Sequence, residues 1–460
     1  MRRSNKTFLL AALVLAGCAH DPMAKPKGPA VPAAFSQGGA VADAKWAEAF
    51  GDAALLDLIA QARQRSPDLV IARARQREAV AFLLATNAGD QPAVSVGAGL
   101  ESSRISLETG RTPVGLGIPR RTDVGAVGVK ASWELDVWGR EAAKTKAADA
   151  DSRAAKFTAE QADLALSAEV ARLWFAVRGA REQLAFLEAE FATRLREMEI
   201  VEKTVGAGLL DSDPLSSARL AAAQAKVDEG LGRRRLAGAE NALRALIGAA
   251  PGAPLPEAKG AVAMPTFGAG VPSELLLRRP DLAAAAARLD AAISREGAAI
   301  ADFYPSVTLN GQAGWQADPA SRVGRGSSSF WSLTPAIDLP LFDAGRREAE
   351  LEVARARIDG SGAEWTKAVL GAFREVEDAL ADLRELALQE DLTARVLAAV
   401  RVRLANAEAR RRAGLANENE TLIARRDEAM AARTLSMVVW ERRQVAVRLA
   451  AATGGGWSAK

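Results

Sequence analysis

The chain has 460 residues, of which 25% are charged and 5% aromatic, and 60 basic residues against 57 acidic ones leave a net charge of +3. This near balance argues against a nucleic-acid-binding protein, which needs a clear basic surplus. The single cysteine, Cys18, and the single histidine, His20, lie two residues apart. The sequence therefore excludes an internal disulfide and a Cys/His metal cluster.

A targeting segment comes first in the chain. Basic residues precede the apolar run FLLAALVLAG, which is too short to cross a bilayer as a helix. The run ends in LAGC, which resembles the bacterial lipobox. That resemblance implies a signal peptide at 1–17 and a lipid-anchored segment at 18–50, which begins with diacylated Cys18. The next residue is alanine rather than aspartate, which by resemblance to sorted lipoproteins favours the outer membrane. The alternative is an ordinary signal peptide with a chance cysteine near its cleavage site.

Internal repeats divide the rest of the chain. SPDL at 66–69 recurs as RPDL at 279–282, and QPAVSVGAG resembles YPSVTLNGQ at the same offset of 213 residues. WELDVWGR and VGAGLLDSDPL have counterparts in IDLPLFDAGR and RRAGLANENETL, offset by 206 residues at their shared glycines. Chance similarity in an alanine-rich chain is the alternative, but the matched residues include proline, glycine, tryptophan and aspartate. The sequence therefore predicts two tandem structural repeats, 51–260 and 261–460.

Each repeat has the same predicted elements in the same order: a helical segment, two strands and a long helical hairpin. The helical segments are predicted at 67–88 and 280–302. The strands are predicted at about 92–107 and 122–137, and at about 305–316 and 329–341. The hairpins are predicted at 139–248 and 345–452, each with a glycine-marked turn.

Apolar and polar residues alternate along the strand stretches, so each strand should have one apolar and one polar face. A transmembrane barrel and a soluble sandwich both have this pattern. After the signal no run of 18 apolar residues exists, so strands should make any membrane crossing. The residues expected to face lipid are Trp133, Val307, Trp315 and Trp331. Those expected to line a lumen are Lys130, Glu134, Asn310 and Gln312. Four strands cannot enclose a water-filled lumen, so we expect several copies to share one barrel.

Apolar residues recur at a heptad spacing along the long helices. In the first repeat they include Val170, Val177, Leu184, Phe191, Met198 and Val205. In the second repeat they include Val376, Leu380, Leu383, Leu397 and Leu404. A sustained period of 3.5 residues predicts a coiled coil, and a 67-residue helix is about 100 Å long. A lipid-anchored coiled-coil scaffold of the envelope is the alternative to a channel.

The motifs ASWELDVWGR, LLLRRPDLAAAAARLDAA and FYPSVTLNG, with the twice-used Gly-Leu tip, resemble the TolC-like outer-membrane factor family. The lipobox makes the chain most similar to its NodT/OprM-like lipoprotein branch. The resemblance implies a mixed α and β membrane protein. It would be a homotrimer with a twelve-stranded β-barrel, four strands per chain, continued by an α-helical coiled-coil tunnel in the periplasm of a Gram-negative bacterium.

The resemblance also implies a passive duct for drugs, metabolites or other small molecules. A periplasmic adaptor (membrane fusion) protein and an inner-membrane pump of the resistance-nodulation-division class would hand the cargo over. The sequence contains no HExxH pattern and no glycine-rich phosphate loop with lysine. We therefore expect no enzymatic activity, no nucleic-acid partner and no cofactor other than lipid on Cys18.

The two hairpin tips are the candidate functional sites. By resemblance, the adaptor should contact the residues at which the long helices end. These residues are Gly206, Gly208 and Leu209 in the first repeat and Gly414 and Leu415 in the second. Helix C-capping is the alternative explanation for the glycines, but it does not explain the leucines.

Acidic residues follow each tip and are the candidate periplasmic gate: Asp211 and Asp213 in the first repeat, and Glu418 and Glu420 in the second. In a trimer each acid is repeated three times, and such a ring selects cations. By resemblance, Glu420 matches the family's first gate acid, whereas the next one would fall at Ile423. The alternative is helix capping by Asp211 or Asp213 and by Asn417.

Three arginines precede the second tip: Arg410, Arg411 and Arg412. We expect them to hold a closed state by pairing with acids of a neighbouring hairpin. Since exposed ion pairs are weak, such a closure needs several of them acting together.

Overall fold

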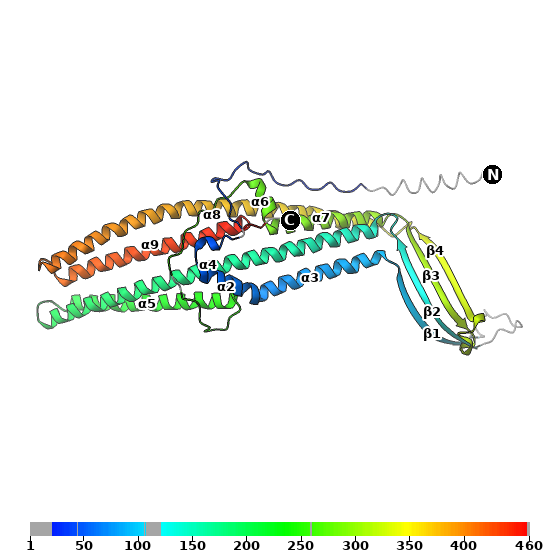
Figure 1. The fold of residues 1–460 in the computed structure, drawn as a ribbon, viewed down its shortest axis with the longest axis horizontal. Helices are drawn as coiled ribbons and strands as arrows, with labels where there is room; N and C mark the ends of the chain where they lie inside the picture. The colour runs from blue at the N-terminus through cyan, green and yellow to red at the C-terminus, as the bar shows by residue number, and fades with distance from the viewer. Residues whose placement is uncertain (1–20, 44, 105, 107–120, 258–259, 458–460) are drawn as a thin grey trace. The chain divides into compact units, whose positions relative to one another are not determined.

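A computed structural model describes residues 21–460 except 44, 105, 107–120, 258–259 and 458–460. Cys18 and the expected signal peptide lie outside the described residues. The described chain combines long helices with one four-stranded sheet (Figure 1), which confirms the predicted mixed α and β fold. Among the described residues, no helix has the length and apolar character to cross a membrane.

The elements follow in the same order in both halves of the chain. The first half contains α2 (Ala53–Arg65), α3 (Pro67–Asn87), β1 (Ala93–Arg104), β2 (Arg121–Leu135), α4 (Arg140–Gly206) and α5 (Asp213–Leu246). The second half contains α6 (Pro272–Arg278), α7 (Pro280–Ala301), β3 (Ser306–Ala317), β4 (Ser329–Asp338), α8 (Arg346–Arg412) and α9 (Glu418–Ala452). Short 3-10 helices lie at Glu48–Phe50, Ala88–Asp90, Ala320–Arg322 and Gly326–Ser328.

The observed limits fall close to the predicted ones, except at the ends of two strands. β1 ends at Arg104, whereas the sequence predicts a strand to about 107. β4 ends at Asp338, whereas the alternation of its side chains predicts a strand to 341. Asp338 pairs with Ser306, the first residue of β3, so β4 has no partner in β3 beyond this point.

The described chain forms two compact units. One contains residues 21–28, 76–155 and 285–365, and the other contains 29–75, 156–284 and 366–457. The long helices α4 and α8 each contribute residues to both units.

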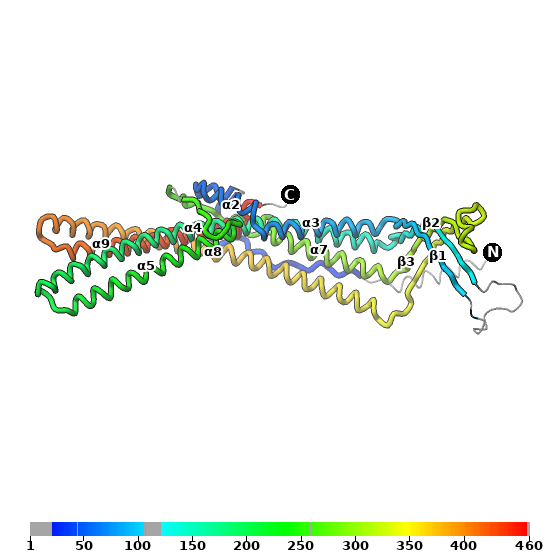
Figure 2. Tube along the Cα trace, turned by 90° about the horizontal axis from the view of Figure 1, so that it is seen from below, coloured from blue at the N-terminus to red at the C-terminus, as the bar shows by residue number. Residues whose placement is uncertain are grey.

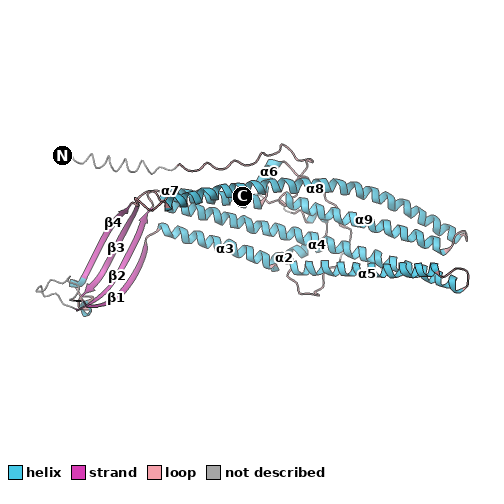
Figure 3. Cartoon of the chain, turned by 180° about the vertical axis from the view of Figure 1, so that it is seen from behind, coloured by secondary structure: helices cyan, strands magenta, loops and turns pink. Residues whose placement is uncertain are grey.

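The first unit contains the sheet, whose strands are antiparallel and lie in the order β1-β2-β3-β4 (Figure 3). Its register places apolar residues opposite one another, for example Trp133 opposite Leu309. It likewise places Lys130 opposite Gln312. Because successive side chains point to opposite faces, this register gives the sheet one apolar and one polar face. The predicted alternation of faces is confirmed.

The second unit has an apolar core that includes Phe50, Leu55, Trp174 and Phe175. Asp52 is buried beside this core. It accepts hydrogen bonds from the indole of Trp174 and from Arg178, both at 2.8 Å, and it also caps the N-terminus of α2. One carboxylate therefore joins α2 to α4.

The RRPDL motif has a structural role in the same unit. The Arg279 side chain is 6% exposed and donates to Glu375 at 2.8 Å and to the Ala452 carbonyl at 3.0 Å. It also pairs with Asp281 at 2.7 Å. A buried arginine needs such partners because unpaired buried charge is costly. Arg279 thus joins the start of α7 to α8 and to the end of α9.

Candidate functional site

The two hairpin tips have the same backbone geometry. Gly208 has φ +72°, its N–H donates to the Val205 carbonyl at 2.9 Å, and the Leu209 N–H donates to the Thr204 carbonyl at 3.1 Å. This pair of hydrogen bonds is a Schellman motif, which needs a left-handed residue and therefore favours glycine. Gly206 is the last residue of α4 and is exposed.

The second tip repeats this arrangement. Gly414 has φ +73° and donates to the Arg411 carbonyl at 3.0 Å, while Leu415 donates to the Arg410 carbonyl at 2.9 Å. The helix-capping interpretation of Gly208 and Gly414 is therefore confirmed. Any further role of the two tips must come from their other residues.

The two tip leucines are exposed. Leu209 is 75% exposed and Leu415 is 70% exposed. In a Schellman motif an apolar residue at this position usually packs back onto its own helix. Here the residues available for that contact are Thr204 and the charged Arg410, so each tip presents a leucine to solvent. Both tips lie at the same end of the second unit (Figure 2).

Glu418 joins the two hairpins of the chain. Its carboxylate accepts hydrogen bonds from Arg196 of α4 at 3.1 and 3.3 Å, and it lies 3.8 Å from Arg411. The hydrogen bonds from Arg196 lower the pKa of Glu418, against a smaller opposing effect of desolvation. Arg196 is a site residue that the sequence analysis missed.

The other acids of the candidate gate have different surroundings. Glu420 lies 3.5 Å from Arg410, and its N–H donates to Asn417, which caps α9 as the sequence suggested. Asp211 and Asp213 are exposed. The N-cap residue of α5 is Ser212, without a side-chain capping bond, so the capping hypothesis fails for the first repeat.

The arginines before the second tip pair differently from the prediction. Arg410 and Arg411 contact Glu420 and Glu418 of their own hairpin. Arg412 donates to the Glu408 carbonyl, one turn earlier in the same helix. Within the described chain, the ion pair that crosses between hairpins at the tip comes from Arg196, because α4 brings its side chain beside the first turn of α9.

A polar seam continues between α4 and α9, away from the tips. Arg433 contacts Gln183 at 3.1 Å and Glu190 at 4.0 Å, and Arg426 lies 3.8 Å from Glu197. The three α4 residues are seven apart, as are the two arginines, so polar contacts occupy positions of the coiled-coil period. The heptad spacing of these polar and charged residues was the feature of the sequence that could have predicted the contacts between α4 and α9.

The polar face of the sheet forms a hollow in the first unit. A cavity of about 450 Å³ is lined there by Lys130, Ser132, Asn310 and Gln312, among others. Ser132 donates to the Asn310 side chain at 2.9 Å, which joins β2 to β3. Of the residues expected to line a lumen, Lys130, Asn310 and Gln312 gather in this cavity, whereas Glu134 binds Arg140 at the junction between the sheet and the helices.

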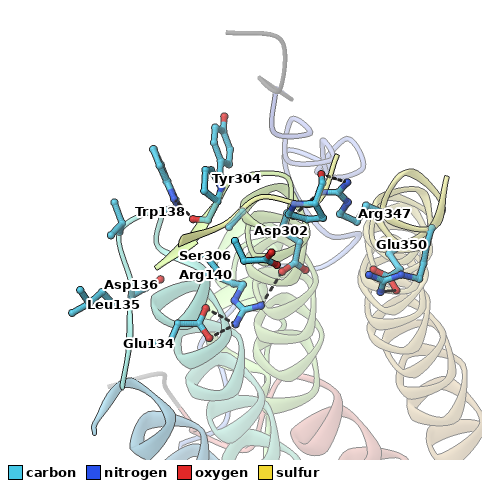
Figure 4. Close-up of a pocket in the computed structure, with 16 residues that line it drawn as sticks. Glu134, Leu135, Asp136, Trp138, Arg140, Asp302, Tyr304, Ser306, Arg347 and Glu350 are labelled. Atoms are coloured by element: carbon cyan, nitrogen blue, oxygen red, sulfur yellow. Dashed lines mark hydrogen bonds and ion pairs between the residues drawn. The ribbon is translucent and has the colours of Figure 1, made fainter. Parts of the chain in front are cut away.

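The WELDVWGR motif forms the junction between this sheet and the helices of the same unit (Figure 4). Arg140 donates to both oxygens of Glu134, at 2.7 and 2.8 Å, and to Asp302 at 3.2 Å. Trp138 stacks on Tyr304 with 5.0 Å between ring centroids. Burial lowers the pKa of Arg140, but the contacts to Asp302 and Glu134 outweigh it and raise the pKa above its ordinary value.

The junction encloses a polar cavity of about 340 Å³. Its contacts fix the end of β2 and the start of α4 to the end of α7. Among the described residues, no group of three or more His, Cys, Asp or Glu side chains is arranged to hold a metal ion.

Comparison with known proteins places this geometry in a family. The family model described as "outer membrane efflux protein" matches residues 58–249 and again residues 271–455. The chain belongs to the outer membrane efflux protein family. It is thus an efflux channel of the outer membrane of Gram-negative bacteria, as the motifs of the sequence indicated.

Relatives in this family match along almost the whole chain. The chain is 31% identical to the outer membrane protein OprJ of Pseudomonas aeruginosa, over 98% of this chain and 95% of OprJ. It is 30% identical to the cation efflux system protein CusC of Escherichia coli O6:H1, over 97% of each chain. It is 29% identical to the toluene efflux pump outer membrane protein TtgI of Pseudomonas putida, over 98% of each chain.

A solved structure of a Pseudomonas aeruginosa membrane protein has the same fold. Its TM-score is 0.84 at 29% identity, and the match covers 95% of this chain and 98% of the other.

Proposed function

We propose that three copies of this chain form one passive duct of a tripartite efflux system. The observation that carries the proposal is the four-stranded sheet with one apolar and one polar face, in a member of an outer-membrane efflux family. Within this sheet β1 and β4 are edge strands, each with one unpaired side. Pairing β4 of one copy with β1 of the next removes all edges and gives a closed barrel of twelve strands.

In this barrel the apolar face, with Trp133, Val307, Trp315 and Trp331, is directed to lipid. The polar face, with Lys130, Gln312 and their neighbours, lines a water-filled lumen. The double match of the family model and the repeated element order support the interpretation of the chain as two tandem repeats. A lipidated N-terminus at Cys18 would add an anchor, because acyl chains contribute about 0.8 kcal/mol per buried methylene.

The adaptor is the expected partner at the two tips. Leu209 and Leu415 are exposed apolar residues at the hairpin ends, and each follows the glycine of a Schellman turn. At the first tip Leu210 is a second exposed leucine. A helical hairpin of the adaptor can cover such residues. The adaptor in turn connects the duct to an inner-membrane pump.

The cargo is selected by the pump and adaptor in this proposal. Relatives of almost equal similarity carry the names of a cation efflux protein and a toluene efflux protein. The similarity of the duct therefore does not follow the chemistry of the cargo. No reaction step is needed for a passive duct, so we assign no catalytic residue.

Conductance in planar lipid bilayers tests the proposal. The purified protein should migrate as a trimer in unheated SDS and should conduct weakly with a preference for cations, because acids repeated three times surround the closed tips. A lipid-anchored scaffold predicts no conductance.

The gate is tested by replacing Asp211, Asp213, Glu418 and Glu420 together with alanine. The variant should conduct more or lose cation preference. Unchanged conductance and selectivity would contradict the role of these acids in gating.

A further inference from the structure

The first described residues of the chain pack against α7 and α8. Residues 21–28 have no regular secondary structure and run between these two helices in the first unit (Figure 2). The side chain of Met23 packs against the small buried cluster of Leu289, Ala292 and Ile358. We name residues 21–28 the strap.

A buried carboxylate holds the strap. Glu296 of α7 is 0% exposed, and its two oxygens accept hydrogen bonds from the Met23 N–H at 3.0 and 2.9 Å. Arg355 of α8 donates to the same carboxylate at 3.2 Å and to the Asp21 carbonyl at 3.1 Å. A buried carboxylate requires such donors, and one of them belongs to the strap. We name Glu296 and Arg355 the clasp.

The rest of the strap also makes close contacts with α7 and α8. Lys25 pairs with Asp290 at 2.7 Å. A Cβ at Gly362 would lie 2.8 Å from Pro26, and a Cβ at Gly28 would lie 2.5 Å from the ring of Trp365. Gly28 on the strap and Gly362 on α8 therefore have no room for a side chain as long as Trp365 and the ring of Pro26 are in place.

The clasp is specific to the second repeat. At the offsets of 213 and 206 residues, the first-repeat counterparts of Glu296 and Arg355 are Leu83 and Asp149. These residues cannot form the same ion pair. The clasp is therefore not a general feature of the repeat and occurs in the copy on which the strap lies.

We propose that the clasp is the docking site of the strap and that it sets how far an acyl anchor on Cys18 can reach; the second part rests on the proposed acylation. Cys18 precedes Asp21 by three residues, which span at most about 11 Å. Arg355 lies nine residues beyond Arg346, the first residue of α8, or about 14 Å along the helix. A docked strap therefore restricts the anchor to the neighbourhood of the sheet end of α8.

The experiment measures docking by disulfide trapping. The double substitution Pro26→Cys and Gly362→Cys removes the proline ring and places two thiols side by side. The Cβ position of Gly362 lies 2.9 Å from the Cβ of Pro26, so the strap must move outward by about 1 Å to reach the Cβ separation of a disulfide. No other cysteine competes, because Cys18→Ala removes the single native one. The full-length trimer with an ordinary cleavable signal should form this disulfide rapidly.

Two matched pairs of variants test the clasp in that background. Glu296→Leu introduces the residue of the first repeat and should slow disulfide formation at least tenfold, whereas Glu352→Leu, at an exposed position of α8, should have no effect. Met23→Pro removes the strap's N–H donor and part of its side chain, and it also fixes φ at this position. It should slow trapping far more than Met23→Ala, which keeps that donor.

Equal trapping rates in Met23→Pro and Met23→Ala would overturn the proposal, even if Glu296→Leu fails to assemble. Trypsin gives a second measurement on the parent protein, because a released strap exposes the Lys27–Gly28 bond to cleavage and a docked one protects it, whereas the Lys25–Pro26 bond resists trypsin in both states. Mass spectrometry of the N-terminus of the parent protein decides acylation separately. Absence of lipid would refute the anchor and leave the docking result standing, whereas absence of conductance bears only on the proposed duct.

Discussion

Among single residues, the acids of the candidate gate have different partners in the structure, although the sequence places them in equivalent positions. Glu418 joins two hairpins through Arg196, Glu420 pairs within its own hairpin, and Asp211 is exposed. These three acids therefore differ in their exposure to solvent and in their ion-pair partners, although all lie near a tip. Among these acids Glu418 is the one on which a closed tip should depend most.

The first prediction concerns Glu418 and pH. Its pKa is lowered below the ordinary value of 4.5, so its attraction to Arg196 is fully present above pH 4.5 and is lost as the pH falls through the folded-state pKa. Bilayer conductance of the parent protein should therefore rise when the pH falls below about 4.5. Arg196→Met should conduct more at pH 7 and should lack this rise.

The control is Arg219→Met, which removes an exposed pair with Glu202 within the first hairpin. It should keep the parent's pH profile. Identical profiles for Arg196→Met and the parent would show that the pair does not hold the tip closed.

At the scale of elements, the sheet is organised by its register. Apolar residues of β2, β3 and β4 lie opposite one another, as Val307 does with Leu135 and Ile337. A shift of one residue would exchange the two faces, so the register is strongly specified wherever the faces have different surroundings.

The second prediction tests which face meets lipid. Val307→Arg should destabilise the assembled protein by less than the roughly 2–4 kcal/mol of a midplane position, because Val307 is the second residue of β3 and lies at the end of the strand. Gln312→Arg, on the opposite face of β3, should assemble normally. The measurement is the fraction of SDS-resistant trimer at increasing temperature, and the reverse result would mean that the faces are inverted.

Across the chain as a whole, the two hairpin tips carry different charges. Residues 196–219 carry three basic and five acidic side chains, whereas the equivalent residues 402–425 carry five basic and three acidic ones. The two tips share their backbone geometry and an exposed leucine. An adaptor therefore meets two surfaces of similar shape and opposite charge, so its contacts with them should differ in salt dependence.

The third prediction follows from the exposed leucines. A photo-crosslinking residue at Leu209 or at Leu415 should capture the adaptor in cells, because an exposed apolar residue on a charged tip is a contact point. The control position is Trp331 in β4, which is 79% exposed in the single chain and is expected to face lipid. Capture of the adaptor at Trp331 alone would show that the tips are not the docking end.

The sequence alone was sufficient to predict the order of the elements, the limits of most helices and the two faces of the strands. These features depend on patterns among residues that are close together in the sequence. The patterns are period-two alternation, heptad spacing and glycine at a left-handed turn. Gly208 and Gly414 were predictable for this reason, and so were Leu209 and Leu415 as exposed residues. The end of β4 was misjudged because alternation continues past Asp338, although its partner strand β3 begins at Ser306, opposite Asp338.

The pairing of the charged groups was not evident before the fold was known. Arg196 and Glu418 are 222 residues apart, and Met23 and Glu296 are 273 apart. Each of these acids has several arginines near it in the sequence, so composition does not select a partner. The packing of the helices selects the partner, because an ion pair or a buried hydrogen bond forms only where the fold brings donor and acceptor within about 3 Å. The tip link and the strap's clasp are therefore properties of the folded chain.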